Sequence, residues 1–446
     1  MRLKKAIVVF LAVLFVVSGT AFADEAGFGF GLGLGIGVQS FPQPDGDLKT
    51  YQSLSLTPDI SFGKFGLGLD VRINYTFTGG DDGDEFEIRR EDWDPAAAGL
   101  NFLELYLPKI RYARWAHKGD PLFVMFGSID AAVLGNGFIL GNYANTQFLP
   151  QRRIFGLSLD VDGALFNFPY VGIETFVANL AAFDLFGTRL FVRPLIGMDI
   201  PIARNLQIGT TLVIDTDPYY HTRLIDETAL PADADDASVL VYGLDFRQPI
   251  LSNPVVSLAT FGDLVFQNNA QGGMLGAGGR LIGIITYGAQ LRFLGDNFIP
   301  VYFDSTYDLR RPDKYAVYNA EETLIEGHVG WFATAGFSLL NDIIVFNVNM
   351  SGPFGDKDGV SPTLGSQFII AEGLIRGVSL SAHYTKFEIE AARDIFSAEN
   401  AVIGARFNYR TGPAVVSLVY DVKYDPTDDA KPWKVTSGLE TSIQLF

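Results

Sequence analysis

The residues of this chain that could do chemistry are charged side chains that alternate with apolar ones. They are Asp70, Arg72, Asp160, Asp162, Arg193, Asp199, Asp215, Asp245, Arg292, Asp304, Asp308, Arg406, Asp421 and Lys423. Such groups can form ion pairs that only support a structure, or they can stand in water and act on solutes that pass them. Because unpartnered charges cannot be packed dry, the set as a whole implies water beside these residues.

Residues 131–153 interrupt this alternation. The segment is partly apolar and partly rich in Asn and Gln, and it ends in Arg152 and Arg153. We expect it to fold inward as a loop and to set these arginines against Asp160 and Asp162 as part of a constriction. A loop that lies outside is the alternative. Further candidates for the same constriction are Asp70, Arg72, Arg292 and Asp304.

The histidines give little support to catalytic chemistry. The chain has four, at positions 117, 221, 328 and 383, and no two of them lie within metal-ligand spacing of each other. No G-x-S-x-G motif occurs. His328 and His383 occupy polar positions of alternating runs, where a hydrated histidine is expected. We therefore predict no enzyme activity, no catalytic residue and no cofactor.

Acidic residues gather in two stretches that read as loops. One contains Asp81, Asp82, Asp84 and Glu85, and the other lies within residues 226–236. A solvated, self-repelling loop is one interpretation. The alternative is that the carboxylates bind divalent cations such as calcium and bridge the loops to each other or to anionic surface glycolipid.

The charge balance excludes nucleic acid as a partner. The formal net charge is −18 for the whole chain, and removal of the three cations Arg2, Lys4 and Lys5 would take it to −21. Phosphate binding requires a basic surface, which this composition does not provide.

The first 23 residues have the physical pattern of a secretory signal peptide. Arg2, Lys4 and Lys5 precede an apolar run at residues 6–17, and residues 21–23 form a small-x-small cleavage site. A lone membrane anchor is the alternative, but the run is shorter than the ~20 residues that a spanning helix needs. The absence of cysteine excludes a lipobox and disulfides. We expect residues 24–446 to form one exported domain.

Residues 64–78 show most clearly which element must position the charged residues. Every second residue from Phe65 to Phe77 is large and apolar, whereas the residues between them include glycine, Asp70, Arg72, asparagine and threonine. This is the period of a β-strand with one apolar face and one polar face. A two-residue turn would pair Phe62 with Phe65. Residues 28–38 alternate bulky residues with glycine in the same way, without the spacing of a phosphate-binding loop.

The alternation recurs along nearly the whole chain. Further strands are expected through Leu103, Leu105 and Leu107, at residues 155–161, and at 190–202, 206–216, 240–247, 256–266, 281–294 and 301–310. Long loops are expected at residues 79–99, 217–238, 268–279 and 311–323, and short turns at 203–204, 295–297 and 341–342. The pattern predicts an all-β fold, a transmembrane antiparallel up-and-down β-barrel of about 20 strands, with roughly 16 to 20 compatible. All short turns and both termini would then lie at one end, and the long loops at the other.

The pattern of the mature chain, which ends in a strand and in Phe446, resembles porin-like outer-membrane β-barrel proteins of diderm bacteria. The cysteine-free, Gly- and Phe-rich composition is loosely similar to that of spirochaete outer-membrane proteins. The resemblance implies location in the outer membrane, contact with its lipid, and insertion by the barrel-insertion machinery through the strand ending in Phe446. Trimers are common among porins, so a homo-oligomer is compatible with it, although no stretch singles out an interface.

Three functions are compatible with these features. A porin would pass small hydrophilic solutes through a charged, water-filled lumen. In a hydrophobic-substrate transporter of the fatty-acid type, the apolar residues of segment 131–153 would line the path, but the Asn-Pro-Ala motif of that class is not found near the mature N-terminus. A surface adhesin would use the acidic loops. We favour the porin.

Overall fold

The described part of the chain covers most of the predicted strands. The computed structural model describes residues 28–42, 48–80, 83–148, 152–200, 202–225, 230–340, 342–357, 359–397, 399–411, 414–424 and 433–444. The predicted signal peptide, Asp81, Asp82 and Phe446 lie outside these ranges. The side chains of Asp421 and Lys423 lie outside the described residues as well.

The strand predicted at residues 64–78 is present, with an interruption at Asp70. It consists of β3 (Phe65–Leu69) and β4 (Val71–Gly80), and both pair with β2 (Leu48–Phe62). Phe62 pairs with Phe65 and Ile60 with Leu67, which confirms the predicted hairpin register. The glycine-rich run forms β1 (Phe28–Pro42), which pairs with the other edge of β2.

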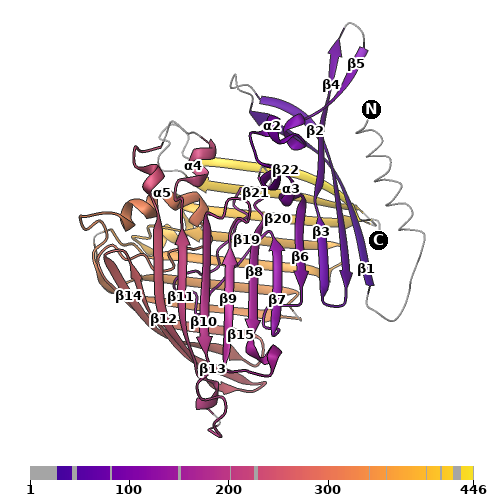
Figure 1. The fold of residues 1–446 in the computed structure, drawn as a ribbon. Coiled ribbons are helices and arrows are strands. Elements are labelled where there is room, and N and C mark those ends of the chain that lie inside the picture. Colours follow the sequence, from indigo (N-terminus) through magenta and orange to yellow (C-terminus); the bar gives the residue numbers. More distant parts are fainter. Residues whose placement is uncertain are drawn as a thin grey trace.

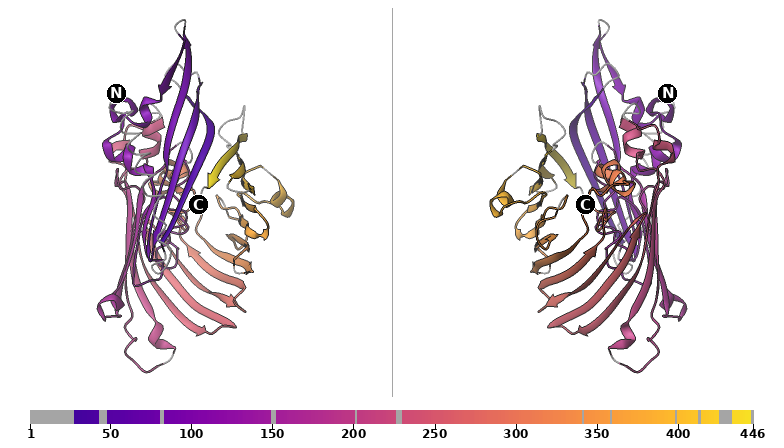
Figure 2. Two further views of the ribbon diagram at one scale, coloured as in Figure 1. Left: turned by 90° about the vertical axis from the view of Figure 1, so that its right-hand side faces the viewer. Right: turned by 90° about the vertical axis from the view of Figure 1, so that its left-hand side faces the viewer.

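A second strand position is also interrupted. β5 (Gly83–Ile88) pairs with β4, and β6 (Ile110–Trp115) pairs with β3 on the same side. The chain between them forms the short helices η1 (Arg90–Asp92), α2 (Pro95–Ala98), α3 (Phe102–Tyr106) and η2 (Leu107–Lys109). The hairpin β4–β5 rises beyond the rest of the sheet (Figure 2).

The remaining strands follow in a regular antiparallel meander. They are β7 (Leu122–Gly127), β8 (Gly156–Asp162), β9 (Val171–Val177), β10 (Leu185–Val192), β11 (Gln207–Asp215), β12 (Val239–Ser252), β13 (Val256–Gln267), β14 (Ala270–Leu281), β15 (Ile285–Leu294), β16 (His328–Leu339), β17 (Ile344–Pro353), β18 (Thr363–Ile375), β19 (Val378–Lys386), β20 (Ala401–Thr411), β21 (Ala414–Tyr424) and β22 (Trp433–Gln444). Each pairs with the next, and the sheet curves round so that one wall faces another (Figure 1).

The two ends of the meander meet. The first and last strands, β1 and β22, pair over four positions, from Gly33 with Gln444 to Ile36 with Thr441. When each of the two interrupted strands is counted once, the 22 strand segments of the described chain occupy 20 positions around the sheet. The fold is therefore the predicted all-β, antiparallel up-and-down arrangement with about 20 strands.

The long connections gather at one end of the strands, as predicted. The chain leaves the sheet there between β5 and β6, β7 and β8, β11 and β12, and β15 and β16. The last two of these connections carry α4 (Tyr220–Ile225) with η6 (Ala234–Asp236), and α5 (Tyr307–Tyr318). Both α-helices lie beside the ends of β11 and β12 (Figure 1). The opposite end has shorter connections, among them η3 (Gly163–Phe166) and η4 (Ala203–Asn205).

Several predicted element boundaries are wrong. Leu103, Leu105 and Leu107 lie in α3 and η2 because Asn101 caps a helix there, with a capping box to Glu104. The loop expected at residues 268–279 is strand β14, and β9 was not predicted. The strand expected at 190–202 ends at Val192.

The largest correction concerns residues 295–327. They were expected to contain a short turn and a strand at 301–310, whereas the whole stretch is one long connection between β15 and β16. Tyr302, Phe303 and Tyr307 of this stretch pack inside the sheet, and α5 begins at Tyr307. No helix of the described chain is long and apolar enough to cross a membrane.

Candidate functional site in the lumen

The two faces of the sheet differ in chemistry, and the difference defines the lumen. In β12, Val241, Gly243 and Asp245 are buried, whereas Tyr242 and Leu244 between them are 47% and 57% exposed. The same alternation holds in β10 and β11. Large apolar side chains that point away from the interior are the reverse of a soluble globular arrangement. On these strands the outer face is apolar, and the inner face carries charged residues such as Arg189 and Asp245 together with apolar ones such as Val213 and Val241.

One half of the lumen is filled by two connections that fold inward. Residues 129–145 and residues 298–307 form an apolar cluster with the inner faces of β9 to β15. The two segments also pair with each other, because Phe303 N donates to Ile139 O at 3.1 Å and Val301 N donates to Phe138 O at 2.9 Å. The predicted inward path of the segment after β7 is what the structure shows.

A buried ionic cluster fixes α5 to the wall beside this apolar cluster. Arg311, which is 1% exposed, binds Asp184 at 2.6 Å, Asp308 at 2.7 Å and Asp215 at 3.4 Å. Tyr143 donates to Asp308 at 2.9 Å. Burial alone would lower the pKa of Arg311, but the attraction of Asp308, Asp184 and Asp215 raises it well above the usual value. Arg311 therefore remains charged in this position.

His221 of α4 extends the ionic cluster. Arg152 donates to Nδ1 of His221 at 2.7 Å, so the neutral ring carries its proton on Nε2, which lies 3.6 Å from Asp308 Oδ1. Burial, together with the positive charge of Arg311, lowers the pKa of His221. Arg152 therefore binds His221 in the packed half of the lumen and does not face Asp160 or Asp162.

A second set of contacts holds the tip of the first inward segment against the wall. Asn136 donates to Asp263 at 3.0 Å and to the carbonyl of Phe246 at 3.1 Å. Nearby, Arg189 binds Asp245 at 2.5 Å and Glu174 at 3.1 Å. The Asn136 bonds join the segment to β12 and β13, and the Arg189 bonds join β10 to β12 and β9 within the wall.

Three of the predicted constriction residues come together. Arg153 donates to Asp70 at 2.5 Å and to Ser128 at 3.0 Å, and Arg72 lies 3.7 Å from the same carboxylate. Asp70 sits where β3 and β4 meet, and Arg72 follows it on the polar face, opposite Ser55. This trio places charges of both signs on the lumen wall beside the start of the inward segment.

The other predicted residues have separate partners. Asp160 lies 3.7 Å from Lys118, and Asp162 binds Arg193 at 2.6 Å. Arg292 is buried and donates to Gln290 Oε1 at 2.9 Å. Its guanidinium carbon lies 4.7 Å from the centre of the Phe332 ring. Asp304 is not on a strand, and it binds Lys314 of α5 at 2.6 Å. The arginines at 152 and 153 do not oppose Asp160 and Asp162.

The structure does not test the predicted acidic cation site. Asp81 and Asp82 lie outside the described residues, and Asp84 and Glu85 belong to β5, with their side chains likewise outside. Among the described residues, no group of three or more His, Asp or Glu side chains could hold a metal ion.

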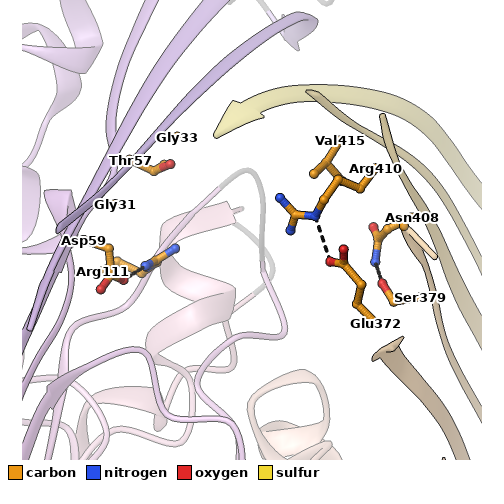
Figure 3. Close-up of a pocket in the computed structure, with 11 residues that line it drawn as sticks. Gly31, Gly33, Thr57, Asp59, Arg111, Glu372, Ser379, Asn408, Arg410 and Val415 are labelled. Atoms are coloured by element: carbon orange, nitrogen blue, oxygen red, sulfur yellow. Dashed lines mark hydrogen bonds and ion pairs between the residues drawn. The ribbon is translucent and has the colours of Figure 1, made fainter. Parts of the chain in front are cut away.

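The other half of the lumen is lined by small and polar side chains. On β2 and β17 to β20 these are Ser55, Thr57, Asn347, Asn349, Gln367, Ser381 and Asn408. Near the short-turn end, a cavity of about 360 Å³ lies between β1, β2 and β6 on one side and β18 to β21 on the other (Figure 3). Each side carries an ion pair, Arg111 with Asp59 and Arg410 with Glu372.

The sequence analysis missed these four residues and the centre of the buried cluster. Asp59 and Arg410 lie on the polar face of strands whose apolar alternation was recognised, so the alternation could have found them. Arg111 lies where the register between β3 and β6 shifts, and Arg311 lies in a helix. No sequence periodicity indicates those two positions.

Comparison with known proteins gives similar structures but no family. No protein-family model matches the chain, and no curated protein matches it. Pseudomonas aeruginosa OccK11 (OpdR) is similar at 9% identity with a TM-score of 0.35, over 95% of this chain and 98% of that one. Pseudomonas aeruginosa OpdQ has 9% identity and a TM-score of 0.33, over 93% and 96%. A mutant of Rh. blastica porin has 12% identity and a TM-score of 0.27, over 94% and 99%.

Proposed function

We propose that this protein is an outer-membrane channel through which small hydrophilic solutes pass passively. The observation that carries the proposal has two parts. The inner face of β2 and β17 to β20 carries small and polar residues such as Ser55, Asn347 and Gln367, and the outer face of β10 and β12 carries exposed apolar residues such as Leu190, Tyr242 and Leu244. An outer apolar face is stable in lipid, and an inner polar face requires water. The path runs through the half of the lumen lined by β1 to β4 and β16 to β21.

The hydrophobic-substrate transporter has less support. Its path would need the apolar residues of segment 131–153 to line an open space. Leu134, Phe138, Ile139 and Leu140 are instead 0–4% exposed and pack against the wall and the second inward segment. They stabilise a packed cluster, which leaves the polar half of the lumen as the route.

Ion selectivity is expected to be weak despite the acidic chain. Charged lumen residues pair with one another, as Arg153 does with Asp70 and Arg193 with Asp162. Paired charges of opposite sign leave a small net field along the path.

Conductance in a planar bilayer tests the proposal. Purified mature protein, refolded and inserted, is expected to give steady single-channel steps and a reversal potential close to zero in a salt gradient. Folding is checked separately by the heat-dependent gel mobility of the barrel. Folded, inserted protein that conducts no ions would contradict the proposal.

A further inference from the structure

A groove on the outer face of the sheet has a floor of glycine. Leu264 of β13, Gly273 of β14 and Phe293 of β15 lie side by side in the paired register, so a glycine separates two large apolar residues. Neighbouring strands lie about 4.8 Å apart, which puts β13 and β15 about 9.6 Å from each other. Since carbon atoms in contact lie about 4 Å apart, one extended hydrocarbon chain fits over Gly273 between the two walls.

The groove continues towards the long-loop end of the sheet. Gly295, just beyond β15, and Gly327, just before β16, also line it, and its volume is about 870 Å³. This volume lies within the range of small-molecule sites. A Cβ atom at Gly273 would lie 3.1 Å from the carbonyl oxygen of Asp263, and one at Gly295 would lie 2.9 Å from that of Gln271. A side chain at either glycine would therefore press on the neighbouring strand.

The lining divides into an apolar part and a polar end. The apolar walls are formed by side chains that are 42% to 57% exposed: Leu264, Phe293, Val329 and Phe354. Among the described residues, the polar side chains of the lining lie at the long-loop end: Gln271, His328 and Lys357. Lys357 donates to Glu326 at 2.6 Å, and its side chain is 30% exposed. A membrane lipid has the same division into apolar chains and a polar head group.

The next row of the same face has no such floor. Leu275, Leu291 and Trp331 lie side by side on β14, β15 and β16, without a glycine between them. A lipid chain over that row would touch protein on one side only, whereas a chain in the groove would touch the floor and two walls. Because van der Waals contacts add up over atom pairs, the groove should hold a lipid more tightly than the surface around it.

We propose that this groove binds one membrane lipid, with an acyl chain over Gly273 and the head group beside Lys357. The inference goes beyond the proposed channel function, because it assigns a ligand to the outer face. It requires only that this face lies in lipid and does not depend on conduction. The bound lipid would remain on the protein when the surrounding lipid is removed.

Native mass spectrometry of the folded protein tests the proposal. The mature protein is purified in a mild detergent and titrated with dipalmitoyl phosphatidylethanolamine. The spectra resolve the protein with no lipid, with one lipid and with more. We expect a first lipid to bind about tenfold more tightly than any further one, which corresponds to about ten additional carbon–carbon contacts.

A side chain that fills the groove should remove this first site. Gly273→Leu occupies the space between Leu264 and Phe293, so the first lipid should bind about tenfold more weakly than in wild type. Ala277→Leu is the matched control. Ala277 lies on the same face of β14 but outside the groove, so this variant should bind lipid as wild type does.

Removal of a wall tests the same site without added bulk. Phe293→Ala deletes the contacts on one side of the chain, so the first lipid should again bind more weakly. Leu291→Ala is its control, because Leu291 lies on the same face of β15 and does not line the groove. The heat-dependent gel mobility of each variant shows that it is folded.

The outcomes separate the lipid site from the alternatives. Equal affinity for successive lipids in wild type, or a first affinity unchanged in folded Gly273→Leu and Phe293→Ala, would overturn the proposal. A dimer that both variants dissociate would also overturn it, because the groove would then hold a second copy of the chain. A wild type that binds the first lipid tightly but conducts no ions would support the lipid site and contradict only the channel.

Discussion

Arg311 is the residue on which the packed half of the lumen depends most. It is surrounded by Asp184, Asp215 and Asp308, and only 1% of it is exposed. We expect Arg311→Leu to lower the free energy of unfolding by about 3–5 kcal/mol, because it leaves buried carboxylates without their cation. Urea unfolding of the inserted protein, followed by tryptophan fluorescence, measures the change.

The adjacent residue provides the control. Arg310 lies next to Arg311 in the sequence, but its side chain is half exposed and its partner Asp313 lies 3.8 Å away. A surface pair of this kind contributes about 0–1 kcal/mol, so Arg310→Leu should change the stability little. Equal effects of the two substitutions would mean that the buried cluster does not stabilise the fold.

At the scale of residues, the sequence indicated which side chains face the lumen but not which ones meet. Asp70 and Arg72 were placed on the polar face by a period of two. Arg72 pairs with Ser55, and Asp70 lies at the break between β3 and β4, outside the register. Arg152 was paired with the wrong carboxylates because its partner, His221, belongs to a connection 69 positions away. Contacts between two loops follow from their packing, which no local pattern encodes.

The first inward segment is the element that we expect to control the width of the path. Its tip is held to the wall by Asn136, which donates to Asp263 at 3.0 Å. Asn136→Asp replaces these donors with a second carboxylate beside Asp263. We expect the tip to leave the wall, and single-channel recordings to show larger current fluctuations than in wild type.

A matched substitution controls for the added charge. Asn205 is exposed in η4 at the short-turn end, so Asn205→Asp adds the same charge away from the segment. Its recordings should resemble wild type. Quiet recordings from Asn136→Asp at the wild-type conductance would show that the tip does not limit the current.

Elements with a long, clean alternation were predicted well. The hairpin that pairs Phe62 with Phe65 was predicted in register, because one apolar side per strand leaves a single consistent pairing. Short apolar runs do not by themselves distinguish a strand from a helix. Residues 301–310 alternate, yet they lead into α5, which is kinked at Arg310. Pro312 lies in the first turn after that kink, a position that a helix tolerates and a central strand does not.

At the scale of the whole molecule, the lumen has two unlike halves. The half along β9 to β15 is filled by an apolar cluster, and the half along β16 to β21 and β1 to β4 is polar. The sequence predicted a charged, wet lumen throughout. It could not show the division, because the inner residues that pack, such as Val213 and Val265, occupy the same alternating positions as the polar ones.

Thiol accessibility tests this division most directly, since the chain contains no cysteine that would interfere. Asn349 lies on the lumen face of β17 and is exposed, Val265 is fully buried in the packed half, and Leu264 beside it is 47% exposed on the outer face. We would change each to cysteine and treat the inserted protein with a charged, membrane-impermeant thiol reagent. We predict that Asn349→Cys reacts and loses conductance, whereas Val265→Cys and Leu264→Cys remain unmodified. Rapid modification of Val265→Cys, or protection of Asn349→Cys, in folded protein would contradict a lumen that is packed on one side and open on the other.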